Sequence, residues 1–272
     1  MKKHTSTILL VFILIIGLSL LLYPSFADWW NSFHQTQVIA DYTTQVANID
    51  DDKYSEIWDA AREYNRSLLD LGSSFQLPEE KLEEYNTLLD IGNNGIMGYI
   101  EIPEVKIMLP VYHGTNEAVL QVAAGHLDWS SLPVGGESTH CVLSGHRGLP
   151  SARLFTDLDK IVEKDIFLLR VLDEVLTYEV DQIRIVLPHE MDDLAIVEGK
   201  DYCTLVTCTP YGINSHRMLI RGHRIDNLQE SKIVRVTADA IQIKPIIVAP
   251  FVASPMLLLL LIVLLIPSRR RR

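Results

Sequence analysis

The run Leu176-Thr177-Tyr178-Glu179-Val180-Asp181 alternates apolar and polar side chains, and this alternation decides the fold class. Side chains of a β-strand point alternately to opposite faces, so such a run is typical of a strand with one buried and one wet face. From Gly98 onward, similar short β-rich runs recur between turn residues. They cover residues 99–102, 107–112, 141–144, 166–171, 176–186, 203–207 and 218–221. We expect a mainly β domain at residues 96–235, a closed or nearly closed antiparallel barrel with short helices at 117–124 and 153–160.

A helical region precedes the β-rich part. An apolar stripe with helical spacing consists of Tyr54, Ile57, Trp58, Ala61, Tyr64 and Leu68. The Leu71-Gly72-Ser73-Ser74 stretch ends this helix, and Pro78 opens a second one that runs to about Leu89. The sequence therefore predicts added helices within an N-terminal region at residues 24–95.

Two apolar runs lie near the ends of the chain. Residues 8–23 hold 14 apolar residues of 16, residues 246–266 hold 18 of 21, and neither run contains a charge. Lys2 and Lys3 precede the first run and four arginines, at 269–272, follow the second. Basic residues favour the cytoplasmic side of a membrane, so both termini are expected there, with the intervening chain on the extracellular face of the cell membrane.

The first of these runs has two interpretations. Residues 1–23 form either a membrane anchor or a signal segment, for which Ser25-Phe26-Ala27 is an acceptable cleavage site. Residues 246–266 predict a C-terminal transmembrane helix, followed by a basic cytoplasmic tail at 267–272.

Charge and cysteine content narrow the class of protein. The chain has 272 residues, of which 48% are hydrophobic, and a formal net charge of −11. Six of its 24 basic residues lie in the two ends, so the middle carries 18 basic and 35 acidic residues, a net charge of −17. This acidity argues against nucleic acid as a partner. Three cysteines exclude a disulfide-dense scaffold, and their odd number leaves at least one thiol free.

The candidate nucleophile is Cys208, in Thr204-Leu205-Val206-Thr207-Cys208-Thr209-Pro210. A cysteine at the end of a β run is presented where a strand meets a loop. A thiol attacks only as thiolate, so it requires a base or a cation nearby. His146, between two glycines after another β run, and Arg217, at the start of a returning strand, are the two candidates. Each signal is weak when it is taken alone.

Taken together, the strings TLVTCTP (residues 204–210), SGHRG (144–148) and NSHRMLIRG (214–222) resemble the three signature segments of sortases. Sortases are membrane-anchored cysteine transpeptidases of Gram-positive bacteria. The strings SLPVGGESTH (131–140), LFTDLDK (154–160) and TCTPYGINSHR (207–217) are similar to the pilus-assembling subgroup, class C. A long helical N-terminal region and a membrane segment after the catalytic domain also match this subgroup. The resemblance covers residues 24–235 and implies an eight-stranded β-barrel with a Cys–His–Arg site.

The resemblance also implies roles. Cys208 would attack the Thr–Gly bond of an LPxTG-like sorting signal, and His146 would protonate the leaving amine and then deprotonate the incoming one. Arg217 would stabilise the tetrahedral oxyanion. A lysine amine of the next pilin subunit would resolve the thioacyl intermediate into an isopeptide bond.

One segment departs from the class C pattern. These enzymes commonly carry a lid with an Asp-Pro-aromatic motif, whereas the corresponding residues 72–78 read Gly-Ser-Ser-Phe-Gln-Leu-Pro. The acidic partner is missing, so a standard autoinhibitory lid is not expected. Phe75 remains a candidate hydrophobic plug.

The remaining chemistry-bearing residues have simpler interpretations. Cys203 lies five residues before Cys208, on the opposite face of a regular strand, so it is expected in the core, as is Cys141; a redox pair of Cys203 and Cys208 is disfavoured. His140, His146, His216 and Cys208 show no standard zinc spacing, and no nucleotide-binding motif occurs, so the sequence predicts no cofactor or metal. Residues 188–200 are either a specificity loop or a solvated connection.

Two alternatives to pilin polymerisation remain. The same nucleophile would serve a sortase that anchors surface proteins to cell-wall precursor, because only the accepting amine differs. A non-catalytic membrane-tethered scaffold for pilus assembly is the third interpretation, against which the intact set of Cys208, His146 and Arg217 argues.

Overall fold

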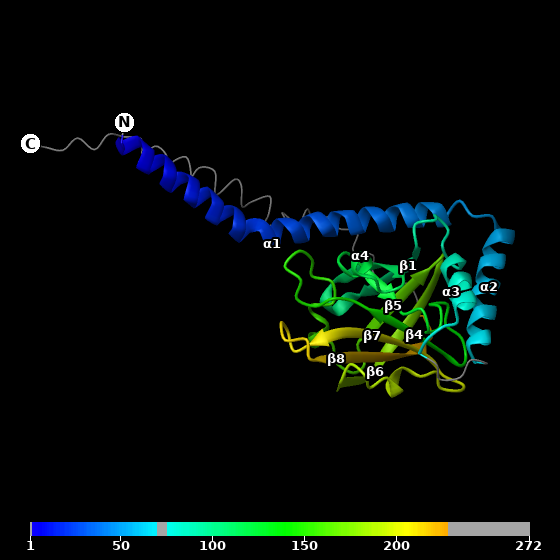
Figure 1. Ribbon diagram of the computed structural model, residues 1–272. Helices are drawn as coiled ribbons and strands as arrows, with labels where there is room; N and C mark the ends of the chain where they lie inside the picture. Colours follow the sequence, from blue (N-terminus) through cyan, green and yellow to red (C-terminus); the bar gives the residue numbers. More distant parts are fainter. Residues whose placement is uncertain (1, 70–74, 228–272) are drawn as a thin grey trace, which may run out of the picture.

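The computed structural model describes residues 2–69 and 75–227 (Figure 1). Its helices are α1 (Lys2–Val46), α2 (Asp51–Leu69), α3 (Glu79–Thr87) and α4 (Glu117–Leu120), with 3₁₀ turns η1 (Pro103–Val105), η2 (Leu158–Lys160) and η3 (Asp192–Leu194). Its strands are β1 (Ile96–Ile102), β2 (Ile107–His113), β3 (Ala124–His126), β4 (Thr139–Ser144), β5 (Ile166–Val171), β6 (Glu174–Val186), β7 (Asp201–Thr209) and β8 (His216–Ile225). The expected transmembrane segment at 246–266 and residues 72–74 of the lid segment lie outside the described residues.

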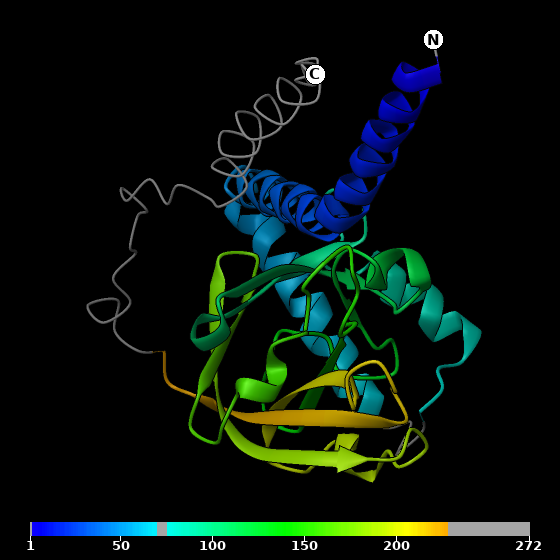
Figure 2. The same cartoon turned by 90° about the vertical axis from the view of Figure 1, so that its left-hand side faces the viewer.

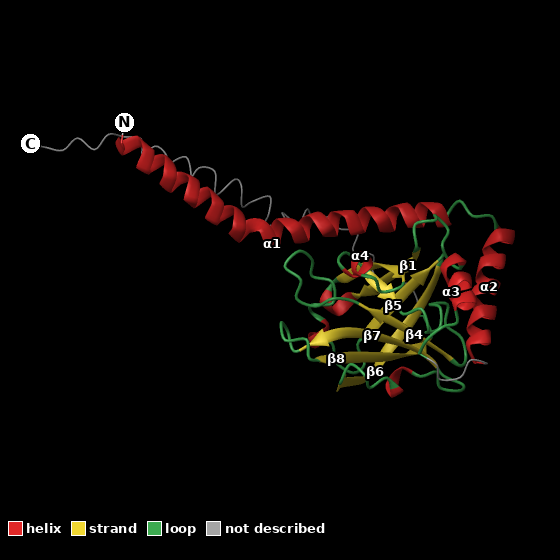
Figure 3. Ribbon diagram, in the orientation of Figure 1, coloured by secondary structure: helices red, strands yellow, loops and turns green. Residues whose placement is uncertain are grey.

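The eight strands close into a barrel in the order β1-β2-β3-β4-β7-β8-β6-β5 (Figure 3), which confirms the mainly β, closed-barrel prediction. The expectation of a wholly antiparallel barrel is wrong at two positions, because β2 pairs with β3 and β4 pairs with β7 in parallel. Alternation of apolar and polar residues shows that a strand has two different faces, but it carries no information about the direction of the neighbouring strand.

Two predicted helices are shorter than expected. The helix at 117–124 ends at Leu120, and Ala124 already begins β3. Gly125 lies in this strand, and a glycine is required there because a Cβ would lie 2.4 Å from the backbone oxygen of Gly114. Within 153–160 only η2 is helical, since Leu154 has a left-handed backbone conformation with φ of 38° that interrupts a helix.

Helices α2 and α3 are fastened to the barrel by side chains. Asn65 of α2 makes two hydrogen bonds to the backbone of Leu132, at 3.1 and 2.7 Å. The hydroxyl of Tyr85 on α3 lies 3.0 Å from Nδ1 of His126 on β3, and both residues are fully buried. These paired polar groups fix the helical region against one wall of the barrel, because an unpaired partner would leave a buried polar group unsatisfied.

Helix α1 extends well beyond the barrel (Figure 1). Within the part of the chain that the structure describes, it is the one helix long and apolar enough to cross a membrane, and its most apolar window is not buried at all. Its C-terminal end packs on the barrel through Ile39, Tyr42 and Val46, and the Tyr42 hydroxyl donates to the Met97 carbonyl at 3.0 Å. The helix therefore joins a membrane-type segment directly to the β domain.

Candidate active site

The three residues singled out by sequence lie at one end of three neighbouring strands. Cys208 on β7 is the direct cross-strand partner of Arg217 on β8. On the other side of β7, Ser144 of β4 is in parallel register with Val206, and His146 follows two residues later. Because β4 and β7 run in the same direction, continuing this register brings His146 alongside Cys208.

The backbone that carries His146 is tied to β7 by two hydrogen bonds. The Gly145 N–H donates to the Val206 carbonyl at 3.1 Å, and the Thr207 hydroxyl donates to the Gly145 carbonyl at 2.8 Å. The His146 carbonyl accepts from the N–H of Phe155 at 3.1 Å. The loop is thus held on both sides of the histidine, so the imidazole is presented from a fixed backbone.

Arg147, the next residue, fixes the far side of this loop. Its Nη2 lies 2.5 Å from Asp159 Oδ2, and Nη1 lies 3.4 Å from the Thr209 hydroxyl. Through these two contacts, Arg147 connects the end of β7 that carries Cys208 with the 3₁₀ turn η2. Arg147 is therefore a structural cation.

Arg217 is partly exposed and arranged to donate hydrogen bonds. Its Nη1 donates to the carbonyls of Asn214 and His216 at 3.2 and 3.1 Å, which fixes the guanidinium plane. Both of these bonds use Nη1. Among the described residues, the N–H groups on Nε and Nη2 of Arg217 are therefore left to donate to a ligand. Cys208 opposite is half-buried and carries a free thiol.

One neighbour of His146 was missed by sequence reasoning. The Glu117 carboxylate at the start of α4 lies 3.8 Å from His146 Nε2, and its side chain is 73% exposed. Its other oxygen accepts from Gln121 Nε2 at 2.5 Å. No sequence signal links residues 29 positions apart, because the contact arises only when β3 and β4 pair.

A second apolar cluster lies on the outer face of β4, β7 and β8, separate from the barrel interior. Its buried members are Val142, Val186, Leu194, Val206 and Leu219. Val206 lies two positions before Cys208 on β7, and Leu219 lies two positions after Arg217 on β8. Side chains two positions apart on a strand point to the same face, so this cluster lies on the face of the sheet that carries Cys208 and Arg217. Phe75 packs on this cluster, with its ring centroid 4.9 Å from that of Trp129 in an edge-on arrangement. The cluster is an apolar floor that leads up to the thiol.

The other two cysteines belong to the barrel interior. Cys141 and Cys203 are partners in the β4–β7 pair, buried and unbridged. Burial raises the pKa of the Cys203 thiol, so this group stays protonated and is a poor nucleophile. Cys203 lies in the core and Cys208 near the surface, as the alternation along β7 predicts.

His140 is committed to structural hydrogen bonds. Its Nδ1 lies 2.9 Å from the Ala195 carbonyl and its Nε2 lies 2.7 Å from the Thr204 hydroxyl. Burial lowers the pKa of His140 to about 4, so the ring is neutral at pH 7. Among the described residues, no group of three His, Cys, Asp or Glu side chains is arranged to hold a metal ion.

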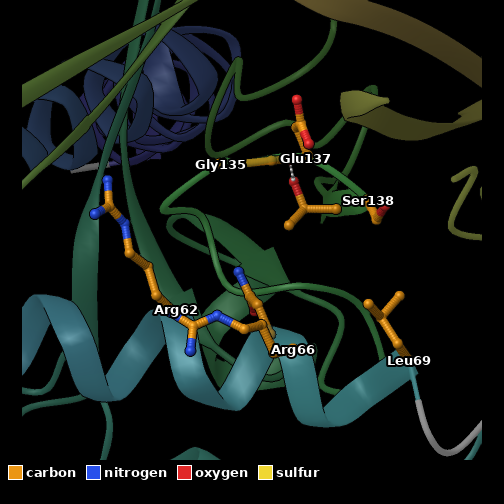
Figure 4. Close-up of a pocket in the computed structure, with 9 residues that line it drawn as sticks. Arg62, Arg66, Leu69, Gly135, Glu137 and Ser138 are labelled. Atoms are coloured by element: carbon orange, nitrogen blue, oxygen red, sulfur yellow. Dashed lines mark hydrogen bonds between the residues drawn. The ribbon is translucent and has the colours of Figure 1, made fainter. Parts of the chain in front are cut away.

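A cavity of about 310 Å³ lies away from these residues, between α2 and the loop before β4 (Figure 4). It is lined by Arg62, Asn65, Arg66 and Leu69 of α2 and by residues 135–139. His146 follows the opposite end of β4, about 20 Å away at the rise of an extended strand. The cavity is therefore distinct from the cluster around Cys208.

Comparison with known proteins identifies the family. The family model described as "Sortase domain" matches residues 100–225. The crystal structure of sortase C1 from Streptococcus agalactiae is 52% identical and superposes with a TM-score of 0.69 over 71% of this chain and 100% of that one. Sortase C of Streptococcus pneumoniae is 44% identical with a TM-score of 0.61, over 70% and 96% of the two chains.

Curated relatives agree over the barrel. Sortase A of Streptococcus agalactiae serotype III is 32% identical over 120 residues, which are 43% of this chain and 48% of that protein. The matched part of this chain thus spans about half the length of that relative. By its sequence and its solved structural neighbours, the chain belongs to the sortase family of cysteine transpeptidases, and within that family to class C.

Proposed function

We propose that this protein is a membrane-anchored transpeptidase in which Cys208 is the nucleophile, His146 the general acid and base, and Arg217 the oxyanion donor. The direct pairing of Cys208 with Arg217, at the end of β7 where His146 emerges from β4, carries the proposal. These are the residue types that acyl transfer through a thioester requires.

The reaction follows from this arrangement. The Cys208 thiolate attacks the threonine carbonyl of an LPxTG-like sorting signal, and the free donors of Arg217 stabilise the oxyanion. When the Thr–Gly bond breaks, His146 delivers a proton to the leaving glycine amine and a thioester remains on Cys208. An incoming amine loses its proton to His146 and attacks the thioester, which forms a new amide and releases the Cys208 thiolate.

A lysine of a pilin subunit is the proposed amine acceptor, so that the product is an isopeptide-linked pilus. The pilin-type structural neighbours and the net charge of −17 between the ends, which attracts lysine-bearing partners, support this assignment. Anchoring of surface proteins to cell-wall precursor is the alternative, because the nucleophile step would be the same and only the accepting amine would differ.

One experiment tests the reaction and the acceptor together. Incubation of the protein with candidate pilins should give isopeptide-linked ladders, and Cys208→Ala should abolish both the ladders and the thioester with a sorting-signal peptide. Cys203→Ala, on the same strand but in the core, is the matched control and should change only stability. Ladders that persist in Cys208→Ala would sink the assignment. A thioester without ladders would point to the wall-anchoring alternative. The absence of both the thioester and the ladders would point to the scaffold.

The membrane topology follows from the two ends of the chain. We place the apolar half of α1 and the segment at 246–266 in the membrane, with both termini cytoplasmic and the barrel on the extracellular face. The basic residues at 2–3 and 269–272 support this orientation. On this assignment residues 1–23 are a retained anchor, 24–95 the helical region and 96–235 the catalytic domain.

We also propose that the described part of the lid segment, residues 75–78, covers the substrate groove, with Phe75 as the plug. Phe75 packs on the apolar floor that contains Val206. Leu194, from the 188–200 loop, is another buried member of this floor. An extended apolar peptide segment would have to displace Phe75 to reach it. This also makes the 188–200 loop a part of the specificity surface.

The chain supplies a matched pair of variants for the plug. Phe75→Ala should raise the rate of peptide cleavage, whereas Leu77→Ala, two residues on but packed on the main core, should leave the rate unchanged. Deletion of residues 70–78 should act in the same direction as Phe75→Ala. Equal rates in the wild type, the deletion and Phe75→Ala would show that no plug operates.

A further inference from the structure

Beyond Pro24, helix α1 holds the barrel along one face. Asp28 Oδ1 accepts from the Arg153 N–H at 2.9 Å, and Asn31 Nδ2 donates to the Ser151 carbonyl at 2.8 Å. Gln35 Nε2 donates to the Val122 carbonyl at 2.6 Å. The three helix residues are spaced i, i+3 and i+7, so they form one stripe along the helix.

The opposite face of the same segment carries an aromatic stripe. Its members, Tyr23, Phe26, Trp30 and Phe33, are 56%, 55%, 50% and 55% exposed. At 3.6 residues per turn these positions centre about half a turn away from the stripe that holds the barrel. The Phe26 and Trp30 rings lie 6.3 Å apart, and Trp30 also contacts His34 at 4.5 Å between centroids. Four exposed aromatic side chains in one row form a large apolar surface with no cover from the described barrel.

The position of this stripe indicates what covers it. The aromatic stripe begins at Tyr23, directly after the apolar stretch at residues 8–22 of the same helix. Aromatic side chains at the end of a membrane-spanning segment partition into the headgroup region of the bilayer, where a ring can meet hydrocarbon on one side and water on the other. The bilayer that α1 enters is therefore its natural occupant.

The contacts with α1 also orient the barrel. Ser151 and Arg153 lie in the loop that begins directly after His146 and Arg147. In Figure 1 the C-terminal end of β7, which carries Cys208, points to the same side as the N-terminal half of α1. Figure 2, seen from that side, brings both the β7–β8 connection and the N-terminal part of α1 toward the viewer. The site end of the barrel and the N-terminal half of α1 thus lie on the same side of the molecule.

We propose that residues 23–35 of α1 form an interfacial strut, whose aromatic stripe lies in the headgroup region while Asp28, Asn31 and Gln35 hold the barrel with its Cys208 end on the side from which α1 enters the bilayer. The strut rests on the membrane attachment proposed above. It goes beyond that function by giving residues 23–35 a lipid contact and the barrel a fixed orientation relative to the membrane. A peptide tethered to the same membrane meets the site in this orientation, whereas a free peptide gains nothing from it.

The first test measures the depth of the stripe. The full chain is placed in vesicles of phosphatidylcholine and phosphatidylglycerol, with bromine atoms on the phosphatidylcholine chains near the headgroups. We expect tryptophan fluorescence to be quenched in the wild type and in Trp58→Phe, whose site is on α2, but much less in Trp29→Phe/Trp30→Phe. Absent quenching, or quenching unchanged in the double variant, overturns the strut. So does a concentration-dependent dimer that protects these tryptophans from the bromolipid.

The second test measures orientation. A sorting-signal peptide is supplied either free or tethered by a short linker to a lipid in the same vesicles. Asn31→Ala/Gln35→Ala should keep the rate with free peptide and lose about threefold or more with tethered peptide, as expected for two lost hydrogen bonds. Gln37→Ala, exposed on another face of α1, is the control and should change neither rate. A double variant that matches the wild type on tethered peptide, or loses both rates equally, overturns the orientation.

The two tests separate this inference from the proposed function. If the wild type is inactive on both peptides but its tryptophans are quenched, the transpeptidase assignment fails and the strut stands. If the protein does not float with the vesicles at all, the membrane attachment fails and the strut fails with it. Activity on both peptides without quenching keeps the enzyme and rejects the strut.

Discussion

Replacing Gly145 by alanine should disable the site from a position that touches no substrate. A Cβ at residue 145 would lie 2.6, 2.9 and 3.0 Å from three ring atoms of Phe155, which is fully buried. Carbon atoms pack at about 3.5–4.0 Å, so the ring and the backbone must separate by roughly 1 Å. Such overpacking costs about 1–3 kcal/mol of unfolding free energy. Since Gly145 precedes His146 and bonds β7 on both sides, a displacement of this size can lower the rate about a hundredfold.

A double-mutant cycle isolates the cause. Phe155→Leu removes the ring edge, so Gly145→Ala/Phe155→Leu should be more stable than the sum of the two single changes predicts, with a coupling of about 1–2 kcal/mol. Urea unfolding gives the stabilities, and thioester formation on a sorting-signal peptide gives the activity, which should partly return in the double variant. Strictly additive stabilities, or a Gly145→Ala protein with wild-type rate, would refute the steric argument.

Three further predictions concern single side chains. Arg217→Lys should lower the rate of thioester formation about a hundredfold, because an ammonium lacks the planar donors of a guanidinium; full activity of the lysine variant would contradict the oxyanion role. Burial lowers the pKa of His140 from 6.5 to about 4, so the unfolded chain takes up the proton first as the pH falls, and unfolding free energy should drop by roughly 3 kcal/mol between pH 7 and pH 4. Urea titrations should show this drop reduced in His140→Gln, and an identical pH slope in both proteins would exclude the histidine as its source. Asp181→Asn weakens a two-pronged contact with Arg221, at 2.9 and 3.1 Å, and should cost about 1 kcal/mol in the same titrations without changing thioester formation; a loss of activity would place this ion pair in the site.

Much of the fold could be predicted because the strands alternate clearly. The run at 176–186 lies within β6, and the other predicted runs likewise fall within the strands of the barrel. β3 was missed because it has three residues, Ala124, Gly125 and His126, which are too few to show a period. The parallel pairing of β4 with β7 was missed because strand direction is decided by the connections and the packing of the whole barrel.

Some residues of the candidate site could likewise be predicted from the sequence, and others could not. Cys208, His146 and Arg217 could be selected from local motifs, and the structure brings the three strand ends that carry them together. Glu117 could not, because its contact with His146 depends on the pairing of β3 with β4 and involves an exposed side chain, which carries no burial pattern. The apolar floor was hidden for a related reason, since its members come from several separate elements and each reads as an ordinary core residue.

The connections of β7 also set the order in which the site assembles. Six residues separate β7 from β8, whereas 56 residues separate β4 from β7. A short hairpin closes quickly and at small entropic cost, while a parallel pair across a long insertion must wait for the strands between them. We therefore expect a folding chain to bring Cys208 and Arg217 together first and to receive His146 last. With the roles proposed above, the thiol would have no base beside it until that final strand pairing, which would delay reaction with any acyl donor until the whole barrel is in place.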